Sequence, residues 1–311
     1  MQSVLVTGGA GFIGSHLCDQ LIEKGYKVIC LDNLLTGSKK NIEHLLGSPN
    51  FEFIEADVTS RFEIPDTRFI FHLASPASPI DYQNYPEETL LTNSTGTINI
   101  LKLAKENNAK VLIASTSEVY GDPLEHPQKE TYLGNVNTFG PRACYDESKR
   151  FGEAATYVFL HKYNIDVRII RIFNTYGPRM KKDDGRVVSN FINNALEDSP
   201  LKVDGDGSQT RSFCYISDLV DGIFKAMFSD NTKGEIFNLG NPDEYKVKDL
   251  ADKIVKLTNS KSEIKYSGAF REDDPMRRQP DITKAKRVLD WEPKVELEEG
   301  LQKTIDYYKS L

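Results

Sequence analysis

The chain has 311 residues, of which 27% are charged, and its formal net charge is −7. This length allows one large domain or two closely joined ones, with ample residues for a core. An acidic chain without a basic stripe is not expected to bind nucleic acid, and no apolar run approaches the roughly 20 residues that span a bilayer, so no membrane contact is expected either.

Four cysteines are spread through the sequence without a C-x-x-C pair. Cys18 and Cys30 lie in expected helix and strand segments, where a small apolar side chain suits a core. The N-terminal residues MQSVLVTGG have the pattern of a strand and not that of a targeting segment. The five histidines show no spacing typical of a metal site, so no metal is expected. Cysteines used in this way are typical of a reducing compartment, and we expect a cytoplasmic protein.

Short apolar segments alternate with longer amphipathic segments through the first half of the chain. The apolar segments have the nearly continuous hydrophobicity of strands that are covered on both faces, which indicates a parallel sheet with helices on either side. The sequence therefore predicts an α/β fold with a doubly wound, mostly parallel Rossmann sheet. Strands are expected at residues 3–7, 27–31, 51–54, 69–73, 110–114 and 166–171, and helices at 12–23, 86–106 and 142–163.

The pattern changes after Arg171, where loops and shorter elements follow. We expect a smaller C-terminal α+β domain that is interleaved with the first, because residues 212–242 again have the pattern of the first sheet. The expected boundaries are 1–175 for the first, Rossmann domain, with 212–242 returning to it, and 176–311 for the second domain. Further helices are expected at 189–196, 216–228, 245–258, 282–289 and 297–308, and a strand at 235–239.

Glycines mark the turn between the first strand and the first helix. Gly8, Gly11 and Gly14 have the spacing G-x-x-G-x-x-G, which allows a close approach of the backbone to a pyrophosphate at the helix N-terminus. A structural turn alone would also use glycines, but the position between strand and helix favours a dinucleotide. Asp32 closes the second strand, where a carboxylate binds an adenosine ribose and repels a 2′-phosphate, so NAD is favoured over NADP. Asp57 ends the third strand and could receive the adenine amino group.

A second motif, Y-x-x-x-K, places Tyr145 and Lys149 one helical turn apart on the same helix face. A tyrosine is a poor base at neutral pH, and a nearby ammonium is expected to lower its pKa. The motif is common by chance, and a surface pair would have the same spacing. Here, however, the strand expected at residues 110–114 is followed by Thr116, Ser117 and Glu118. Hydroxyls and a carboxylate at that edge of the sheet, beside a dinucleotide turn, indicate a reactive centre.

Together these motifs resemble the extended short-chain dehydrogenase/reductase superfamily. Longer segments, from Gly8 to beyond Arg278, are similar to the UDP-glucuronate decarboxylases, also called UDP-xylose synthases. Three positions depart from that family's common residues: Leu133 stands for tryptophan, Thr138 for proline and Ser148 for glycine. None of them removes a reactive group, although Leu133 and Thr138 fall on an expected substrate-side loop. The similar segments are HLASPASPIDY, ASTSEVYGDPLEHPQ, GNVN, GPRACYDESKR, RIFNTYGPRM, DGRVVSNFI, GDGSQTRSFCYISDLV and FNLGNP.

The resemblance implies an enzyme that decarboxylates UDP-glucuronate to UDP-xylose with tightly bound NAD. Tyr145 would take the C4 hydroxyl proton while the C4 hydride goes to NAD, and the C4 ketone would let the C5 carboxylate leave as CO2 before the hydride returns. Thr116 and Ser117 would stabilise the oxygen on C4, and Glu118 would handle a proton near C5, through a water. Related dehydratases carry an aspartate at the position of Ser117 as the acid for loss of water, so this serine argues against a dehydratase.

The resemblance also implies further contacts and an assembly. Arg278 would hold the sugar carboxylate in a bidentate pair. A homodimer would form through residues 86–106 and 142–163. Ala155, Val158 and Phe159 have a helical spacing that fits this interface and equally fits packing on the sheet. Cofactor contacts are implied for Phe12, Ile13, Asn33, Val58 and Leu73, and contacts with the diphosphate or the sugar for Asn174, Arg179, Arg186, Val187 and Arg211.

Other functions stay open from the residues alone. One is a UDP-sugar 4-epimerase or an NDP-sugar 4,6-dehydratase of the same superfamily; the long similar segments argue against the epimerase. Another is a non-catalytic regulator that senses NAD, which would have no need of Tyr145 and Lys149. Release of CO2 from UDP-glucuronate would distinguish all of these.

Overall fold

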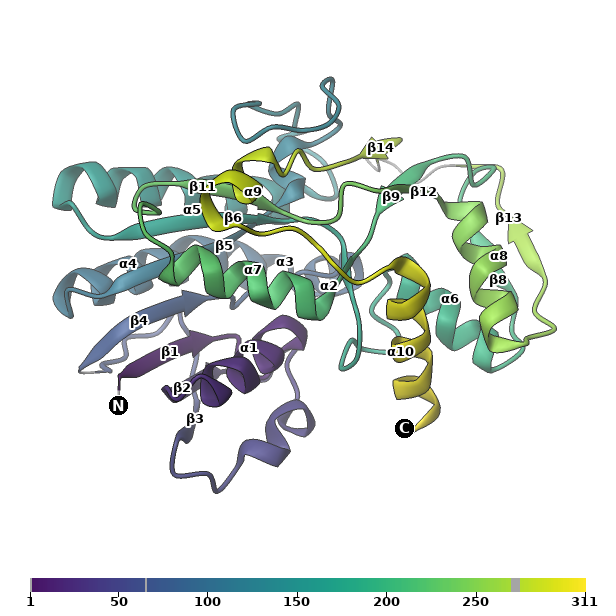
Figure 1. Ribbon diagram of the computed structural model, residues 1–311. Coiled ribbons are helices and arrows are strands. Elements are labelled where there is room, and N and C mark those ends of the chain that lie inside the picture. Colours follow the sequence, from purple (N-terminus) through teal and green to yellow (C-terminus); the bar gives the residue numbers. More distant parts are fainter. Residues whose placement is uncertain (1, 65, 270–274) are drawn as a thin grey trace.

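The computed structural model describes residues 2–64, 66–269 and 275–311 of the protein. Within these residues a parallel sheet of seven strands forms the centre, in the order β11-β6-β5-β4-β1-β2-β3 (Figure 1). The strands expected for this sheet are confirmed to within two residues at each end. Their bounds are β1 (Ser3–Thr7), β2 (Lys27–Asp32), β3 (Phe51–Glu55), β4 (Thr67–His72), β5 (Lys110–Thr116), β6 (Val167–Ile172) and β11 (Ile236–Leu239).

The strand order reverses beside β1, which pairs in parallel with β2 on one side and with β4 on the other. In doubly wound sheets, ligands bind in the crevice at the carboxyl ends of the strands beside such a reversal. Helix α1 (Phe12–Glu23) begins there, directly after the glycine turn. The polar end of β5 lies at the same edge of the sheet, because all these strands run in the same direction.

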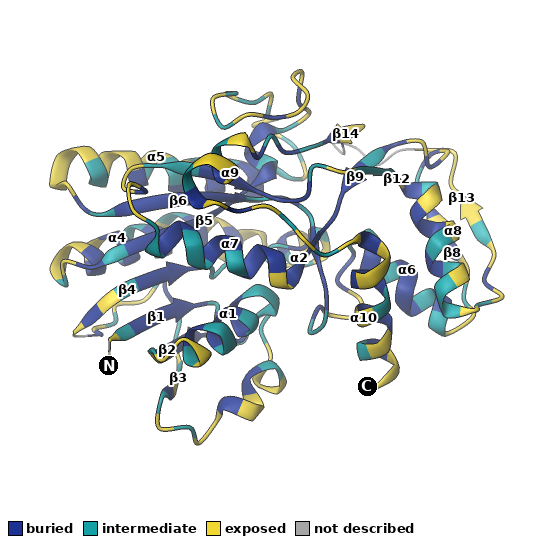
Figure 2. Cartoon of the chain, in the orientation of Figure 1, coloured by how far each residue is buried: buried dark blue, intermediate teal, exposed yellow. Residues whose placement is uncertain are grey.

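Alternate residues of each strand point to opposite faces of the sheet, and each face has its own core. Val4 and Val6 of β1 pack in one cluster with α1 and α7 (Ile216–Phe228). Leu5 between them belongs to the other cluster, with α4 (Thr97–Glu106) and α5 (Ala143–Tyr163). Figure 2 shows the strands as mostly buried between these helices. Cys18 and Cys30 lie fully buried in the first cluster, as expected of small apolar residues.

The helix expected at residues 86–106 is interrupted. In its place the structure has α3 (Pro86–Leu91), a π-helical turn η2 (Thr92–Gly96) and α4. Two contacts from outside the local segment occur at this turn. Asn93 Nδ2 donates to Ser148 Oγ on α5 at 3.1 Å, and a Cβ on Gly96 would come within 2.7 Å of Val58. Neither contact affects the spacing of apolar residues along the segment, so the hydrophobic pattern does not predict the π-helical turn.

The remaining elements form a second lobe beside the carboxyl edge of the sheet (Figure 1). Its helices are α6 (Val187–Leu196), α8 (Val247–Thr258) and α10 (Leu297–Lys309), and they lie close to their expected bounds. Helix α9 (Thr283–Leu289) also lies close to its expected bounds, but it packs against β11 of the first sheet. The expected elements do not include strands of two or three residues, because these are too short to show a hydrophobic period. Here β7 (Thr175–Tyr176) pairs with β10 (Cys214–Tyr215), β8 (Leu201–Val203) with β13 (Ile264–Tyr266), and β9 (Thr210–Ser212) with β12 (Glu244–Lys246) and β14 (Arg277–Arg278).

The pairing of β11 with β6 brings the end of residues 212–242 into the first sheet. The domain boundaries themselves stay a prediction. Among the residues that the structure describes, no helix is both long enough and apolar enough to cross a membrane. Three short elements outside the expected set complete the fold: η1 (Lys39–Leu45), α2 (Pro79–Asn84) and η3 (Ser117–Tyr120).

Candidate active site

A cavity of about 610 Å³ lies between the carboxyl edge of the sheet and the second lobe. Its volume is in the range of sites that hold cofactors and small substrates. The glycine turn, the end of β5, the start of α5 and β14 all contribute to its wall. Every predicted site residue lines it except Asp57.

The turn after β1 has a close backbone packing that only glycine allows. Gly8 has a φ of +72°, and a Cβ there would come within 2.8 Å of the Ala74 backbone. A Cβ on Gly14 would overlap the carbonyl oxygen of Gly8, so the first turn of α1 packs directly on the loop. Phe12 and Ile13 take the first helical positions. Free backbone N–H groups and the helix dipole at this end favour a phosphate group.

Asp32 closes β2 and is buried at the wall of the cavity. One carboxylate oxygen accepts a hydrogen bond from the N–H of Ala10 at 3.0 Å, and the other from that of Leu34 at 2.8 Å. Burial raises the pKa of this carboxyl, and the two backbone hydrogen bonds offset part of the rise. Each oxygen keeps a lone pair for a ribose hydroxyl, whereas a 2′-phosphate would meet an acidic group. The arrangement fits the adenosine of NAD.

Asp57 follows β3 but does not line the cavity, whereas its neighbour Val58 does. The Asp57 carboxylate accepts hydrogen bonds from Asn33 Nδ2 at 2.9 Å and from Thr59 N at 2.8 Å. Its contact with an adenine amino group therefore stays a prediction, and it would require an oxygen to share these bonds. Asn33, Val58 and Leu73 line the cavity, where the resemblance implies cofactor contacts.

Tyr145 lies in the first turn of α5 and is buried. Its ring stacks on that of Tyr82 in α2, with centroids 5.0 Å apart. Burial raises the pKa of Tyr145 to about 12, and the hydrogen bond between its hydroxyl and that of Thr116 offsets part of the rise. The pKa of Tyr145 is therefore raised in the protein alone, whereas the neighbouring lysine is expected to lower it.

Burial also affects Lys149 itself. Its Nζ donates to the Ala114 carbonyl at 2.9 Å and lies 5.8 Å from the centre of the Tyr145 ring. Burial lowers the pKa of Lys149 to about 7, although Glu153 acts in the other direction. The lysine therefore carries a full charge for only part of the time at neutral pH, and it stabilises a phenolate less than the sequence pattern alone suggests.

A buried polar network lies behind these two residues. Ser115 Oγ donates to Glu153 Oε1 at 2.6 Å, and Arg171 Nη2 lies 2.7 Å from Glu153 Oε2. Arg171 also donates to the hydroxyl of Tyr120 at 2.9 Å. The network fixes the end of β5 against α5 and so positions Thr116 relative to Tyr145. No motif in the sequence indicates it, because its four members lie on four separate elements.

The Glu118 carboxylate, at the start of η3, lies between two arginines. Arg142 at the N-cap of α5 donates to Oε2 through Nη2, and Arg278 on β14 donates to Oε1 through Nη1. Burial alone would raise the pKa of Glu118, but the two guanidinium groups hold it at about 2. Glu118 is therefore an anionic hydrogen-bond acceptor at neutral pH. The sequence motifs predict Glu118 and Arg278 at this site, and they miss Arg142.

Asp146, next to Tyr145 in the chain, is a second carboxyl group of this cluster. Its Oδ2 lies 3.8 Å from Arg142 Nε, and its Oδ1 is buried without a hydrogen-bond partner among the described residues. Burial and the charge of Glu118 raise the pKa of Asp146 to about 7. Ser117 is buried beside Glu118 and lines the cavity.

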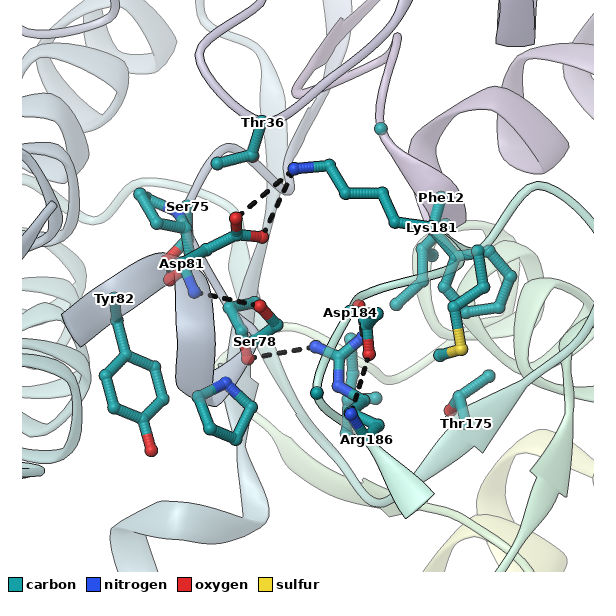
Figure 3. Close-up of a pocket in the computed structure, with 18 of the residues that line it drawn as sticks. Phe12, Thr36, Ser75, Ser78, Asp81, Tyr82, Thr175, Lys181, Asp184 and Arg186 are labelled. Atoms are coloured by element: carbon teal, nitrogen blue, oxygen red, sulfur yellow. Dashed lines mark hydrogen bonds and ion pairs between the residues drawn. The ribbon is translucent and has the colours of Figure 1, made fainter. Parts of the chain in front are cut away.

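Figure 3 shows the part of the cavity where the second lobe meets α2 and the loop before it. Lys181 Nζ lies 3.2 Å from the Asp81 carboxylate of α2. Arg186 donates to the Ala77 carbonyl at 2.9 Å and pairs with Asp184 at 3.1 Å. These contacts join the two lobes across the cavity, and of their members the sequence predicts only Arg186.

The other residues predicted to contact substrate also line the cavity. Arg211 on β9 lies directly opposite Arg278 on β14 in the strand register, which brings two guanidinium groups to one wall. Arg179 Nη1 lies 2.7 Å from the Asp19 carboxylate on α1. Asn174 and Val187 complete the predicted set.

The three departures from the family pattern lie away from the cavity wall. Leu133 is 84% exposed, Thr138 is exposed, and Ser148 Oγ donates to the Cys144 carbonyl within α5 at 2.6 Å. None of the three lines the cavity. They therefore leave its walls unchanged.

A Rossmann sheet whose crevice joins a glycine turn, Asp32 and a Thr-Tyr-Lys set defines an extended short-chain dehydrogenase/reductase. The profile of a family described as GDP-mannose 4,6 dehydratase matches residues 5–304. UDP-glucuronic acid decarboxylase 1 of Xenopus tropicalis is 52% identical over 308 residues, which cover 99% of this chain and 72% of that relative. UDP-glucuronic acid decarboxylase 5 of Arabidopsis thaliana is 54% identical, over 96% of this chain and 86% of that relative.

Among solved structures, the UDP-glucuronic acid 4-epimerase of Bacillus cereus in complex with UDP-glucuronic acid and NAD is similar, with a TM-score of 0.89. It is 30% identical, over 99% of both chains. The chain belongs to the GDP-mannose 4,6 dehydratase family and, within it, to the UDP-glucuronic acid decarboxylases. The resemblance seen in the sequence is thereby confirmed.

Proposed function

We propose that this protein decarboxylates UDP-glucuronate to UDP-xylose through a 4-keto intermediate, with tightly bound NAD as its cofactor. The observation that carries the proposal is the position of Arg278. Its guanidinium lines the cavity beside Glu118, and its Nε is buried without a hydrogen-bond partner among the described residues. A donor of this kind suits a carboxylate on the sugar. The relatives named decarboxylases, more than 50% identical, support the same reaction.

The residues present fit NAD. The glycine turn permits contact with a pyrophosphate, and Asp32 has lone pairs for the ribose. NAD, when bound, accepts the C4 hydride of the sugar and returns it after CO2 has left. It is therefore neither consumed nor required in excess. The related epimerase of Bacillus cereus, which holds NAD, supports this assignment.

Tyr145 and Thr116 act on the oxygen of C4. Tyr145 takes the hydroxyl proton as the C4 hydride leaves, and these two losses together give a ketone β to the sugar carboxylate. Loss of CO2 places the electrons of the broken C5–C6 bond in an enolate, whose oxygen accepts hydrogen bonds from both hydroxyls. Lys149 lies one turn from Tyr145 to exchange a proton with it. The balance of the reaction is the uptake of one solvent proton at C5 in place of CO2.

Arg278 and Glu118 act on the other side of the sugar. Arg278 holds the carboxylate until it leaves. Glu118, which its arginine partners keep anionic, accepts a hydrogen bond from the water that delivers the C5 proton. Its low pKa supports a role as acceptor and argues against a role as the acid itself. Arg179, Arg186 and Arg211 would hold the diphosphate and the sugar, together with Asn174 and Val187.

Two alternatives belong to the same superfamily. A 4-epimerase would use the same Tyr145 and the same cofactor, and the Bacillus cereus relative of that activity also holds UDP-glucuronic acid. Binding of UDP-glucuronate alone does not distinguish the two reactions. A 4,6-dehydratase would need an acid at the position of Ser117.

A homodimer through α3 and α5 is part of the same proposal. Leu90, Leu91, Phe151, Tyr157 and Val158 are large apolar side chains on these two helices, each 43% to 64% exposed. The helices pack side by side, so these side chains gather on one face of the protein, and such a face favours a self-complementary interface.

Two residues expected in this interface lie elsewhere. Ala155 and Phe159 pack against the core of the sheet, and of the three residues singled out from helical spacing, only Val158 is exposed. A cytoplasmic location is also proposed, supported by four cysteines that are all free.

Incubation of the purified protein with UDP-glucuronate and NAD, followed by mass spectrometry of the nucleotide sugar, tests the function. We expect a UDP-pentose. A product of unchanged mass with inverted C4 would identify an epimerase, and a product that has lost water would identify a dehydratase. A nucleotide sugar that remains unaltered while NAD binds would favour the regulator.

A further inference from the structure

Glu118 is held from two sides by arginines that belong to distant parts of the chain. Arg142 comes from the start of α5, and Arg278 comes from β14. All three side chains are at most 14% exposed. In such surroundings a guanidinium–carboxylate pair makes up for the lost hydration of its charges only while both partners stay together.

A substrate carboxylate competes with Glu118 for Arg278. Nη1 of Arg278 is engaged by Glu118, and Nη2 donates to the Gly121 carbonyl at 3.0 Å. Nε has no hydrogen-bond partner within the described part of the chain. The guanidinium has five N–H groups, so an arriving carboxylate can bind through Nε–H together with a second N–H, and it then shares the charge of Arg278 with Glu118. If Arg278 were the sole cationic partner of Glu118, its loss to the substrate would leave a buried, unpaired carboxylate. Glu118 would then bind a proton, or the ion pair would resist separation.

Arg142 is fixed independently of Arg278. Its Nε lies 3.8 Å from Asp146, one turn along α5. Its guanidinium lies 6.0 Å from the centre of the Tyr82 ring, which stacks on Tyr145. Arg142 can therefore remain on Glu118 when Arg278 moves.

We propose that Arg142 is a positioning residue for decarboxylation: it keeps Glu118 anionic and in place while Arg278 binds the sugar carboxylate. The inference rests on the proposed function. In the free protein, Arg142 and Arg278 both pair with Glu118. In the complex, Arg142 would pair with Glu118 and Arg278 with the sugar carboxylate. Departure of CO2 then returns Arg278 to Glu118.

The charged and titratable groups that face Glu118 come from three elements besides its own. They are Arg142, Tyr145 and Asp146 of α5, Arg278 of β14 and Tyr82 of α2. Of these, the two arginines alone favour the anion of Glu118. Once Arg278 is engaged by substrate, removal of the Arg142 charge leaves Glu118 to take up a proton.

Arg142→Gln tests this, with Arg142→Lys as the variant that retains the charge and Lys162→Gln as a control on the exposed end of α5. Arg142→Gln should lower kcat for CO2 release by roughly 10- to 100-fold, since a hydrogen bond between charged groups is lost, with a much smaller change in KM. In the pH profile of its kcat, the fall on the acidic side (the acid limb) should move toward neutral pH. Glu118 must be anionic to act, and without Arg142 it binds a proton at a higher pH. Arg142→Lys should return the limb toward that of the unaltered protein, and Lys162→Gln should change neither quantity.

A calorimetric measurement reads the same event without turnover. UDP-glucuronate is titrated into each variant, saturated with NAD, in buffers of different ionisation heat. Arg142→Gln should take up about one proton per site more than the unaltered protein. Adding Glu118→Gln to Arg142→Gln should abolish that extra uptake. If Arg142→Gln does not fold, Arg142→Lys, which replaces the planar guanidinium by a single ammonium group, should give a smaller extra uptake in the same direction.

An unshifted acid limb together with no extra proton uptake would overturn the role of Arg142. Failure of the unaltered protein to release CO2 is a different outcome, which rejects the proposed function instead. The proton uptake of Arg142→Gln would then still show whether Arg142 holds the charge of Glu118.

Discussion

The ring of Tyr82 lies parallel to that of Tyr145, with centroids 5.0 Å apart and planes 9° apart. Tyr82 belongs to α2, which precedes α5 by some sixty residues and carries no part of the Y-x-x-x-K motif. The stack limits the rotation of the Tyr145 ring, so its hydroxyl stays directed at Thr116. The loop before α2 also contacts the second lobe through Arg186 (Figure 3). The contact between the lobes and the orientation of Tyr145 thus depend on the same segment.

Loss of the stacked ring should slow the oxidation of C4. Tyr82→Ala is expected to lower the rate of NADH formation from UDP-glucuronate by roughly 3- to 10-fold, because an aromatic pair contributes about 0.5–1.5 kcal/mol. Tyr82→Phe keeps the stack and should retain most of the rate. Single-turnover absorbance of NADH measures both, with Tyr145→Phe as the variant that should lose more than about 100-fold. Equal rates for Tyr82→Ala and Tyr82→Phe would exclude the orienting role of the stack.

The stability of the protein without cofactor should depend on the charge of Lys149. Burial lowers the pKa of this residue from 10.5 to about 7, so between these values the unfolded chain holds a proton that the folded protein lacks. The free energy of unfolding is therefore lowered most by Lys149 below pH 7, where its buried side chain is charged. This loss of stability shrinks as the pH increases from about 7 to about 10.5.

Lys149→Met should accordingly raise the free energy of unfolding by on the order of 2 kcal/mol at about pH 6, and by much less at about pH 10. Urea unfolding of both proteins at the two pH values measures the difference. A gain of the same size at both values would mean that the change acts through packing and not through the buried charge.

Local patterns predict the sheet and most helices well, and they predict the site less completely. α1 and α7 begin and end at their expected residues, because each has a clear apolar stripe over several turns. The turn η2 and the two-residue strand β14 have no such signal. In the site, Tyr145 is recognisable from its motif, whereas Arg142 pairs with a residue 24 positions away, on another element.

The Y-x-x-x-K motif also does not predict the electrostatic surroundings of Tyr145 and Lys149. Its spacing indicates that Tyr145 and Lys149 are neighbours, and from this a lowered tyrosine pKa is expected. The structure adds the burial of both groups, which raises the pKa of Tyr145 and lowers that of Lys149. Burial depends on the packing of α2 and β5 around α5, which no short segment of the sequence describes.

Asp32 should exclude NADP. Asp32→Ala removes the carboxylate that a 2′-phosphate would face, and we expect the affinity for NADP to rise by roughly 10-fold or more relative to that for NAD. Titration of each cofactor into the protein, followed by calorimetry, gives the ratio of the two dissociation constants. Asp57→Ala is the matched control, because a contact with the adenine would affect both cofactors alike and leave the ratio unchanged. If the unaltered protein binds NADP as tightly as NAD, Asp32 does not contact the ribose.

The apolar face on α3 and α5 should hold two copies of the chain together. Replacing both Tyr157 and Val158 by glutamate places charges in the proposed interface and should give a monomer at micromolar concentration. Sedimentation equilibrium of the variant and of the unaltered protein measures this. Tyr266→Glu, at a residue of similar exposure in the second lobe, should leave the dimer intact. An unaltered protein that sediments as a monomer would exclude the interface altogether.

The most direct measurement of the central claim follows the sixth carbon of the sugar. UDP-glucuronate labelled with ¹³C at that carbon is incubated with the purified protein and with far less NAD than substrate. We predict that labelled CO2 and UDP-xylose appear in equal amounts, over many turnovers for each NAD, because the hydride that leaves C4 returns to it. A nucleotide sugar that keeps the label after its conversion would contradict the account.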